Sequence, residues 1–382
     1  MSRHTAIPYW SLSSFYLLYF ASIGTLVPYW GLYLSSQGFS VAQIGELTAV
    51  IMATKIIAPN IWGWIADHTG KRMRIIHLAS FLSSLSFAAI LLDNSYLWTM
   101  LVMFVFSFFW NANLPQFEAI TLAHLGKQTH RYSNIRLWGS IGFILAVVVI
   151  GAVIEEQGAG WIPLFMLALL VGVWGLSLLT PDCHETYHGD AVVDFMSVLR
   201  QPVVIALLLV CFLLQASHGP YYAFYTIYLE SNGYTRSTIG LLWALGVVAE
   251  IVIFMLMHRL MPRFGARNLM MWALALTAIR WMAIGVSVEN HGVMILAQLL
   301  HAASFGLYHA VAIHLIHRFF PGRLTGRGQA IYSSISFGAG GAMGALYSGY
   351  VWQSNGPQMA YGISAILCVV ACLITYKMIH ER

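Results

Sequence analysis

The chain has 382 residues, of which 59% are hydrophobic and only 9% are charged, with a formal net charge of +5. Soluble domains carry about 25% charged residues, so a water-soluble fold could not cover this much apolar surface. In lipid every backbone polar group must be satisfied internally, which leaves helices or a closed barrel. Apolar runs of about 20 residues without strict alternation favour helices. The composition therefore predicts an all-α integral membrane protein and gives no indication of a nucleic-acid partner.

Twelve apolar stretches of membrane-spanning length follow one another along the chain. We expect spans at about 10–34, 42–66, 74–93, 96–124, 134–155, 161–180, 203–230, 237–258, 268–288, 292–317, 327–353 and 357–378. The connecting loops are short, except for the polar segment 181–202 at the centre. Six spans, a long loop and six spans predict two six-helix bundles, 1–180 and 203–382, joined by a central cytoplasmic loop.

Lysine and arginine residues in the loops and at the ends of the spans are distributed unevenly between the two sides of the membrane. If the N-terminus is cytoplasmic, fifteen of them fall on the cytoplasmic side and only Arg236 falls on the outer side. Cytoplasmic loops carry an excess of Lys and Arg, so this count supports an even number of spans with both termini cytoplasmic. We expect a multi-pass protein of a bacterial-type inner (plasma) membrane.

The loop after the second span reads Gly-Trp-Ile-Ala-Asp-His-Thr-Gly-Lys-Arg over 63–72. Its glycines permit a tight turn, and its aspartate can cap a helix end and pair with a basic residue. This pattern resembles the signature loop of the major facilitator superfamily, and 259–267 is a degenerate echo of it without the aspartate. The resemblance implies a transporter with twelve helices in two pseudo-symmetric bundles and alternating access. The residues of this conformational loop are Gly63, Asp67, Gly70, Lys71 and Arg72.

Ionisable residues inside the spans are functional candidates by default. The spans contain Lys55, Glu118, Arg136, Glu250, Arg280 and the histidines His218, His301, His309 and His314. Glu118 and Arg136 stand 18 residues apart in two consecutive spans, which must be antiparallel neighbours. A buried carboxylate and a buried guanidinium are each costly in lipid and tolerable together. We predict that this pair faces across one interface and forms part of a substrate site.

The segments around this pair resemble the sugar-binding pair of the lactose permease group. Pro115-Gln-Phe-Glu118 and Arg136-Leu-Trp-Gly139 match in spacing and in their two helices. The resemblance also implies that Arg280 is a second functional arginine and that His301 belongs to a proton relay. The chain departs from the group at Ser304, where the group has its proton-carrying glutamate. Glu250 supplies an acid in span eight, whereas the acids of span seven are absent.

A closer resemblance, over nearly the whole chain, is to the phenylpropionate permease branch of the superfamily. It rests on a basic residue in span two and on the segments 136–140, 242–250 and 280–281. The resemblance implies proton-driven uptake of a small aromatic carboxylic acid such as 3-phenylpropionate, with the proton gradient as the energy source and no cofactor. It also implies a monomer.

The residues themselves fit this chemistry. A monocarboxylate needs a cation inside the membrane, which Lys55, Arg136 or Arg280 can supply. For Lys55 three alternatives remain: it pairs with an acid on another helix, its ionisation is shifted by burial, or it awaits an anion. An aryl ring needs an apolar wall. Packing between helices or facing lipid is the more usual role of a single aromatic side chain. With that alternative kept open, the candidates are Tyr19, Tyr29, Trp30, Trp110, Tyr221, Tyr222 and Tyr225. Asn111 and Asn113 could supply hydrogen bonds to a substrate or to a neighbouring helix.

For proton coupling we favour Glu118 and Glu250, because a carboxylate in an apolar cavity can load and release a proton near neutral pH. His301 is the third candidate, since histidine titrates in the same range. It could equally form a hydrogen bond between helices.

Other functions are also compatible with parts of this sequence. A proton symporter for a sugar or nucleoside would use Glu118 and Arg136, whereas Lys55 favours an anion. Export is as compatible with the fold as uptake. An integral-membrane enzyme or receptor is the alternative from another class. However, His301, His309 and His314 have spacings of eight and five, which form no ligand stripe, and the sequence has no phosphate loop or paired-cysteine site. We therefore expect neither enzymatic activity nor a metal site.

Overall fold

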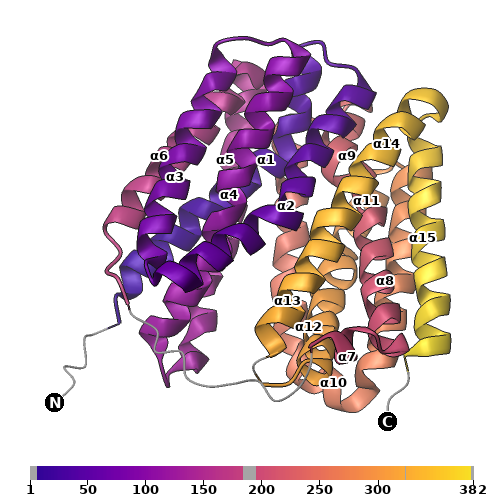
Figure 1. The fold of residues 1–382 in the computed structure, drawn as a ribbon. Coiled ribbons are helices and arrows are strands. Elements are labelled where there is room, and N and C mark those ends of the chain that lie inside the picture. The colour runs from indigo at the N-terminus through magenta and orange to yellow at the C-terminus, as the bar shows by residue number, and fades with distance from the viewer. Residues whose placement is uncertain (1–6, 184–194, 323, 380–382) are drawn as a thin grey trace. The chain divides into compact units, whose positions relative to one another are not determined.

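The computed structural model describes residues 7–183, 195–322 and 324–379, and within these residues every regular element is a helix (Figure 1). This confirms the predicted all-α class. Residues 184–194 of the expected central loop, and Arg3, Arg323 and Arg382 from the charge count, lie outside the described residues.

The first six spans begin and end within a few residues of the predicted positions. They are α1 (Tyr9–Ser36), α2 (Val41–Thr69), α3 (Arg72–Ala88) with the 3-10 turn η1 (Ala89–Leu91), α4 (Tyr96–Leu125), η2 (Thr129–Arg131) with α5 (Tyr132–Gln157), and η3 (Ala159–Trp161) with α6 (Ile162–Leu178).

The second six spans are less regular than the first. They are α8 (Pro202–Ser217) with α9 (Gly219–Ser231), the two parts of α10 (Arg236–Val286), α11 (His291–Leu299) with the π-helix η4 (Ala302–Leu307) and α12 (Tyr308–Phe319), α13 (Leu324–Ser333) with the π-helix η5 (Ser334–Gly340) and α14 (Gly341–Asn355), and α15 (Pro357–Met378). A short helix that the sequence did not predict, α7 (Phe195–Leu199), precedes them.

The helix α10 contains two predicted spans in one run of 51 residues. Its backbone is interrupted at Gly265, where φ is 75° and ψ is 159°. A left-handed conformation of this kind favours glycine. Ten helices among the described residues are long and apolar enough to cross a membrane. Counting both parts of α10, and adding the run from α13 to α14, gives twelve helical spans in the described part of the chain.

By its internal contacts the chain divides into two compact units. Unit 1 comprises Met1–Trp30 and Ile57–His188, and unit 2 comprises Gly31–Ile56 and Gly189–Arg382. The end of α1 and the first part of α2 thus group with the C-terminal helices. The predicted bundles 1–180 and 203–382 stay a prediction.

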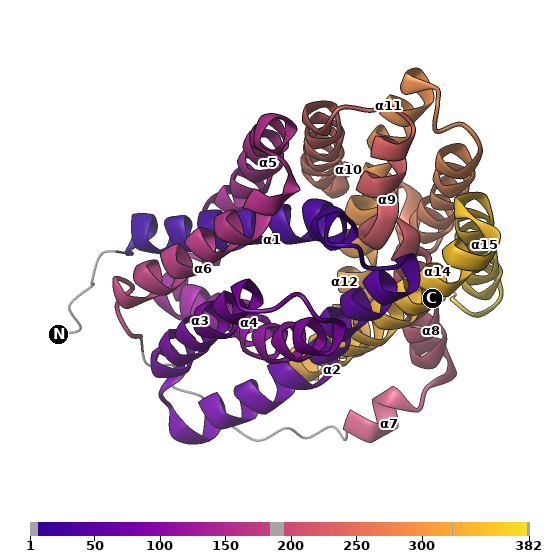
Figure 2. The same cartoon turned by 90° about the horizontal axis from the view of Figure 1, so that it is seen from above.

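In unit 1, α3 packs between α4 and α6, as Figure 2 shows from above. The contact between α1 and α5 depends on small residues. A Cβ at Gly24 would lie 2.9 Å from the carbonyl oxygen of Phe143, and one at Gly142 would overlap the carbonyl of Leu17. Glycines at these positions let two helix backbones approach closely, as in other membrane helix pairs.

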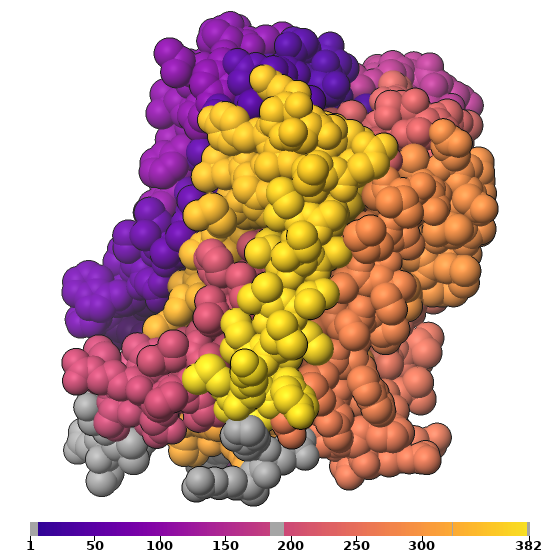
Figure 3. Space-filling model, turned by 90° about the vertical axis from the view of Figure 1, so that its right-hand side faces the viewer, coloured from indigo at the N-terminus to yellow at the C-terminus, as the bar shows by residue number. Residues whose placement is uncertain are grey.

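In unit 2, α15 packs against α8 and α10. Figure 3 shows the opposite face of α15 on the surface, where Ile366 is 62% exposed and Leu373 is 55% exposed. Exposed apolar side chains along a whole helix are expected where the surrounding solvent is lipid. Gly31 allows the end of α1 to approach α9, since a Cβ there would lie 2.5 Å from the carbonyl oxygen of Ala223.

Candidate functional site

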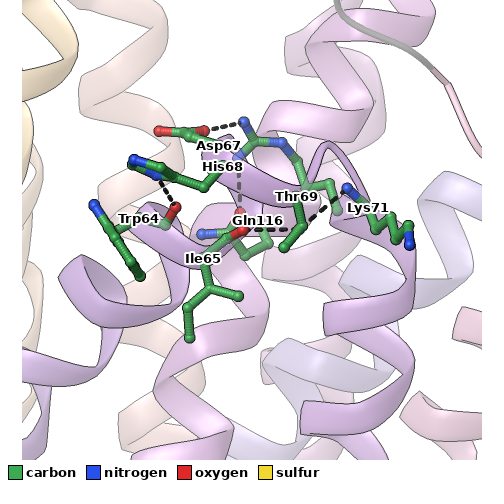
Figure 4. Close-up of polar contacts among 8 residues, drawn as sticks. Trp64, Ile65, Asp67, His68, Thr69, Lys71 and Gln116 are labelled. Carbon is green, nitrogen blue, oxygen red and sulfur yellow. Dashed lines mark hydrogen bonds and ion pairs between the residues drawn. The ribbon is translucent and has the colours of Figure 1, made fainter.

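The turn between α2 and α3 carries the motif of the signature loop. α2 ends at Thr69, and Gly70 turns the chain with a φ of 64°. Arg72 donates hydrogen bonds to Asp67 Oδ1 and to Gln116 Oε1, each at 2.7 Å. Figure 4 shows the contacts that run from Asp67 and Gln116 to this one guanidinium. The expected pairing of Asp67 with a basic residue is present, and the same base also reaches α4.

Glu118 on α4 and Arg136 on α5 are both half-buried. The hydroxyl of Tyr132 donates a hydrogen bond to Glu118 Oε1 at 3.1 Å. The guanidinium of Arg136 lies over the ring of Phe20, 3.7 Å from its centroid. Its charge is near enough to act on the carboxylate, yet neither side chain has a direct ion pair among the described residues. The structure therefore places the predicted pair in one neighbourhood and shows Tyr132 as the residue that contacts Glu118.

Gly139 leaves the room for the stacking of Arg136. A Cβ at Gly139 would lie 2.6 Å from Arg136 Nη1 and 2.8 Å from Phe20 Cδ2. A larger residue would push the guanidinium off the ring. The Arg-x-x-Gly spacing of the sequence thus has a local physical cause.

The two asparagines of α4 are buried in unit 1. Asn113 is fully buried, and its Oδ1 accepts a hydrogen bond from the hydroxyl of Ser80 on α3 at 3.0 Å. Its Nδ2 is buried without a hydrogen-bond partner among the described residues. Asn113 therefore keeps one donor that a ligand or a water molecule could satisfy.

Most of the aromatic candidates in unit 1 pack between helices. The hydroxyl of Tyr29 donates to the carbonyl oxygen of Val147 at 2.5 Å. Trp30 packs on Phe87 with ring centroids 5.5 Å apart. Tyr29 is fully buried and Trp30 is 2% exposed, so these contacts leave little of either ring accessible. Their predicted place in a substrate site stays a prediction.

Lys55 lies in the part of α2 that belongs to unit 2. Its neighbours Met52 and Ile56 pack against Gly341 and Gly338 of span eleven. Lys55 is half-buried, and no hydrogen bond or ion pair joins its ammonium to any residue that the structure describes. Of the three alternatives for Lys55, pairing with an acid is therefore absent from this structure.

Arg280 is fully buried and held by three neutral acceptors. It donates to the carbonyl oxygen of Ala297 at 2.8 Å, to Ser304 Oγ at 2.8 Å and to Gln298 Oε1 at 3.3 Å. Its guanidinium also lies 4.2 Å from the ring centroid of Tyr221. Ser304, at the position where the lactose permease group has a glutamate, thus holds the arginine through a neutral hydroxyl.

The predicted proton carriers of unit 2 lie beside this arginine. His301 Nε2 is 3.8 Å from Glu250 Oε2. The other ring nitrogen of His301 and the Nε2 atom of Gln298 are buried and have no hydrogen-bond partner among the described residues. Tyr222 stacks on His218 with ring centroids 5.3 Å apart. Glu250, Arg280 and His301 therefore lie close together, and the unsatisfied nitrogens of His301 and Gln298 could form hydrogen bonds with a ligand or water.

Sequence reasoning missed Gln116, Tyr132 and Gln298. Each contacts a predicted residue: Arg72, Glu118 and Arg280, respectively. Each is an uncharged polar side chain within, or at the edge of, an apolar run. That signal was available in the sequence, but a search restricted to charged residues does not find it.

Twelve helical spans with ionisable side chains buried inside them define a multi-pass membrane transporter. A family model described as "MFS_1 like family" matches residues 9–363. The chain belongs to this family of the major facilitator superfamily, whose members are secondary transporters of small molecules rather than enzymes.

Individual relatives share the length of the chain. It is 27% identical over 366 residues to the "Probable 3-phenylpropionic acid transporter" of Escherichia coli (strain K12), covering 93% of each chain. It is 28% identical over 372 residues to the "Maltose permease" of Geobacillus stearothermophilus, covering 95% of this chain and 93% of that one. The crystal structure of the nucleoside transporter NupG aligns with a TM-score of 0.86 at 16% identity, over 98% of this chain and 99% of that chain, and so shares the fold.

Proposed function

We propose that the chain is a proton-coupled symporter of a small aromatic monocarboxylic acid such as 3-phenylpropionate, and that it works by alternating access. The observation that carries the proposal is the ammonium of Lys55, which has no hydrogen bond or ion pair with the described residues. An unpaired charge inside a membrane protein is costly and marks a functional position. A substrate carboxylate would supply the missing partner.

The remaining cations have partners of other kinds. Arg280 is held by three neutral acceptors, and Arg136 is stacked on Phe20. Arg280 would have to give up one of these hydrogen bonds to bind an anion, whereas Lys55 would form a new charge-assisted hydrogen bond without breaking an existing contact. The name of the Escherichia coli relative supports an aromatic acid as the anion.

For the proton we propose Glu118 and the Glu250–His301 pair. A carboxylate near a cation changes its proton affinity when an anionic substrate competes for that cation. Arg136 stands in this relation to Glu118. His301, 3.8 Å from Glu250, would do so only in its protonated form. Substrate binding and proton loading would thereby be linked. On the basis of the loop charges we further propose that the protein lies in the inner membrane with both termini cytoplasmic. That it is a monomer is proposed from the family resemblance alone.

The test is uptake of labelled 3-phenylpropionate into proteoliposomes with and without an inward proton gradient. We expect gradient-stimulated uptake that is lost in Lys55→Ala. Lys127→Ala, which removes an exposed lysine from the α4–α5 turn, is the matched control and should transport normally. Binding of a neutral sugar without uptake of any aromatic acid would contradict the proposal.

A sugar is the second candidate, for a specific reason. Gln298 accepts hydrogen bonds from Arg280 and from the hydroxyl of Tyr221, at 3.3 and 3.1 Å, and its own amide nitrogen is unsatisfied. Hydrogen-bonding groups of this kind, an amide and a phenol beside a guanidinium, suit the hydroxyl groups of a sugar, and one relative is named a maltose permease. Competition of maltose for binding in the same preparation separates the two candidates.

A further inference from the structure

Spans ten and eleven of unit 2 each contain a π-helical segment, η4 and η5. π-helical turns are rare and frequently occur at functional sites. Each segment carries a phenylalanine in its middle. The rings of Phe305 and Phe337 contact each other with centroids 6.2 Å apart and an interplanar angle of 54°. The two irregular segments therefore meet through their aromatic side chains.

Further rings extend this contact. On one face of span ten, His301, Phe305 and His309 stack in series with centroid distances of 5.8 and 5.7 Å. The ring of Phe337 lies 6.0 Å from that of His309 and 5.8 Å from that of Tyr332, both edge-on. We call these five rings the aromatic cluster.

The aromatic cluster continues the polar interior of unit 2. His301 lies 3.8 Å from the carboxylate of Glu250, and polar groups in membrane helices face the protein interior or a water-filled cavity. Phe305 stacks on the same face and shares this environment. Tyr332 is only 2% exposed, whereas Phe305 and Phe337 are half-buried. The rings of Phe305 and Phe337 are thus partly accessible, and the buried ring of Tyr332 packs against that of Phe337.

The segment η5 also connects the cluster to the helix that carries Lys55. Gly338 directly follows Phe337, and a Cβ there would lie 2.7 Å from Ile56 Cγ1. The hydroxyl of Ser334 donates to the carbonyl oxygen of Ile56 at 3.4 Å. Ile56 directly follows Lys55. One π-helical segment therefore carries an accessible aromatic ring and packs on the backbone beside Lys55, whose ammonium has no hydrogen bond or ion pair with the described residues.

We propose that Phe305 and Phe337 form the aryl-recognition subsite of this transporter. The aromatic ring of the substrate packs against their half-buried faces, while its carboxylate pairs with Lys55. This inference rests on the proposed function and adds the residues that distinguish an aromatic acid from an aliphatic one. Contacts between aromatic rings are favourable beyond the area they bury, so two phenylalanines can distinguish a phenyl ring from a cyclohexyl ring of similar size.

The test compares equilibrium binding of 3-phenylpropionate and 3-cyclohexylpropionate to the full-length protein in lipid nanodiscs. The two acids share the carboxylate and the chain, and differ in the π system of the ring. We expect wild type to bind the phenyl acid about tenfold more tightly, and Phe305→Leu and Phe337→Leu each to reduce this ratio about threefold. Phe305→Tyr and Phe337→Tyr, which keep an aromatic ring, should retain the wild-type affinity ratio.

The control variant is Phe254→Leu, the same change at a side chain of α10 that is 39% exposed, and it should keep the wild-type ratio. A wild-type ratio near one would overturn the inference without any variant. If the wild-type ratio were near one but both acids bound more weakly to Lys55→Ala, only the subsite would be contradicted and the proposed function would stand. An unchanged ratio in both folded leucine variants would likewise overturn the subsite alone. Binding of neither acid would overturn both proposals.

Discussion

Arg72 reaches back across the α2–α3 turn to Asp67, with Nη2 and Oδ1 2.7 Å apart. The side chain of Asp67 is 64% exposed, and exposed ion pairs contribute only about 0–1 kcal/mol to stability. The second hydrogen bond of the same guanidinium, to Gln116 on α4, is part-buried. The contact thus acts chiefly as a geometric constraint between a turn and a neighbouring helix.

We therefore expect Arg72→Lys to slow transport more than it weakens binding. A lysine keeps the charge but has no planar fork to hold Asp67 and Gln116 together. Initial uptake rates should fall several-fold, while substrate affinity and thermal stability stay close to wild type. Arg74→Lys, two residues further along α3, is the matched control. Equal loss of affinity and rate in Arg72→Lys would contradict a role in the conformational step.

Glu118→Gln should separate exchange from proton-driven accumulation. The amide oxygen can still accept the hydrogen bond of Tyr132, but the side chain no longer binds or releases a proton. We expect substrate exchange between loaded proteoliposomes to persist and the response to a proton gradient to disappear. Tyr132→Phe removes the same hydrogen bond and keeps the carboxylate, so it should retain the response. Gradient-driven uptake by Glu118→Gln would assign the coupling elsewhere, with Glu250 and His301 as the next positions.

Arg280→Met should destabilise the protein. The change removes a fully buried guanidinium and leaves the carbonyl of Ala297 and the hydroxyl of Ser304 without their donor. Each buried polar group left unpaired costs about 1–3 kcal/mol, so we expect a loss of at least about 2 kcal/mol. Thermal unfolding in detergent measures it. A variant as stable as wild type would show that Arg280 serves the ligand rather than the fold.

Lys55→Met, unlike Arg280→Met, should weaken substrate binding without lowering the stability of the protein. No described residue loses a hydrogen bond, so stability should stay equal or rise. Affinity for the aromatic acid should fall roughly 10- to 100-fold, as expected for one charge-assisted hydrogen bond. Unfolding and binding are measured on the same sample. A marked loss of stability with unchanged affinity would instead indicate a structural lysine.

Gly142→Ala should separate α1 from α5. The added Cβ would overlap the backbone carbonyl of Leu17, which no change of rotamer can relieve. Overpacking of this kind costs about 1–3 kcal/mol. Gly175→Ala on α6 is the control, because nothing lies within 4 Å of its Cβ position and alanine favours a helix. Lower stability is expected for the first variant alone.

The sequence predicted the fold well because lipid imposes simple rules on it. Long apolar runs must be helical, and the loops then follow from chain order. The motif around Asp67 also predicted its own contact, because it is local: Asp67 and Arg72 are five residues apart. The prediction of side-chain contacts was less complete wherever the partner lies on a helix that is distant in the sequence.

Arg136 illustrates the limit of sequence reasoning at the site. Its guanidinium stacks on Phe20, more than a hundred residues earlier in the chain, and no periodicity indicates that contact. The π-helical segments η4 and η5 are a second example, since their local sequences read as ordinary apolar helix. Which polar groups in a span find partners depends on packing between helices, and one sequence does not contain that information directly.

The interruption at Gly265 has a consequence for how the protein is inserted. Fifty-one residues of unbroken helix would extend about 75 Å, more than twice the roughly 30 Å of a bilayer's hydrocarbon core. Each crossing carries the chain to the other side, so the parity of the crossings determines where the C-terminus ends. The break at Gly265 divides α10 into two crossings, and without it the number of crossings would change from even to odd. A side chain at Gly265 would strain this positive-φ conformation, so we expect the glycine to be needed for α10 to provide two crossings.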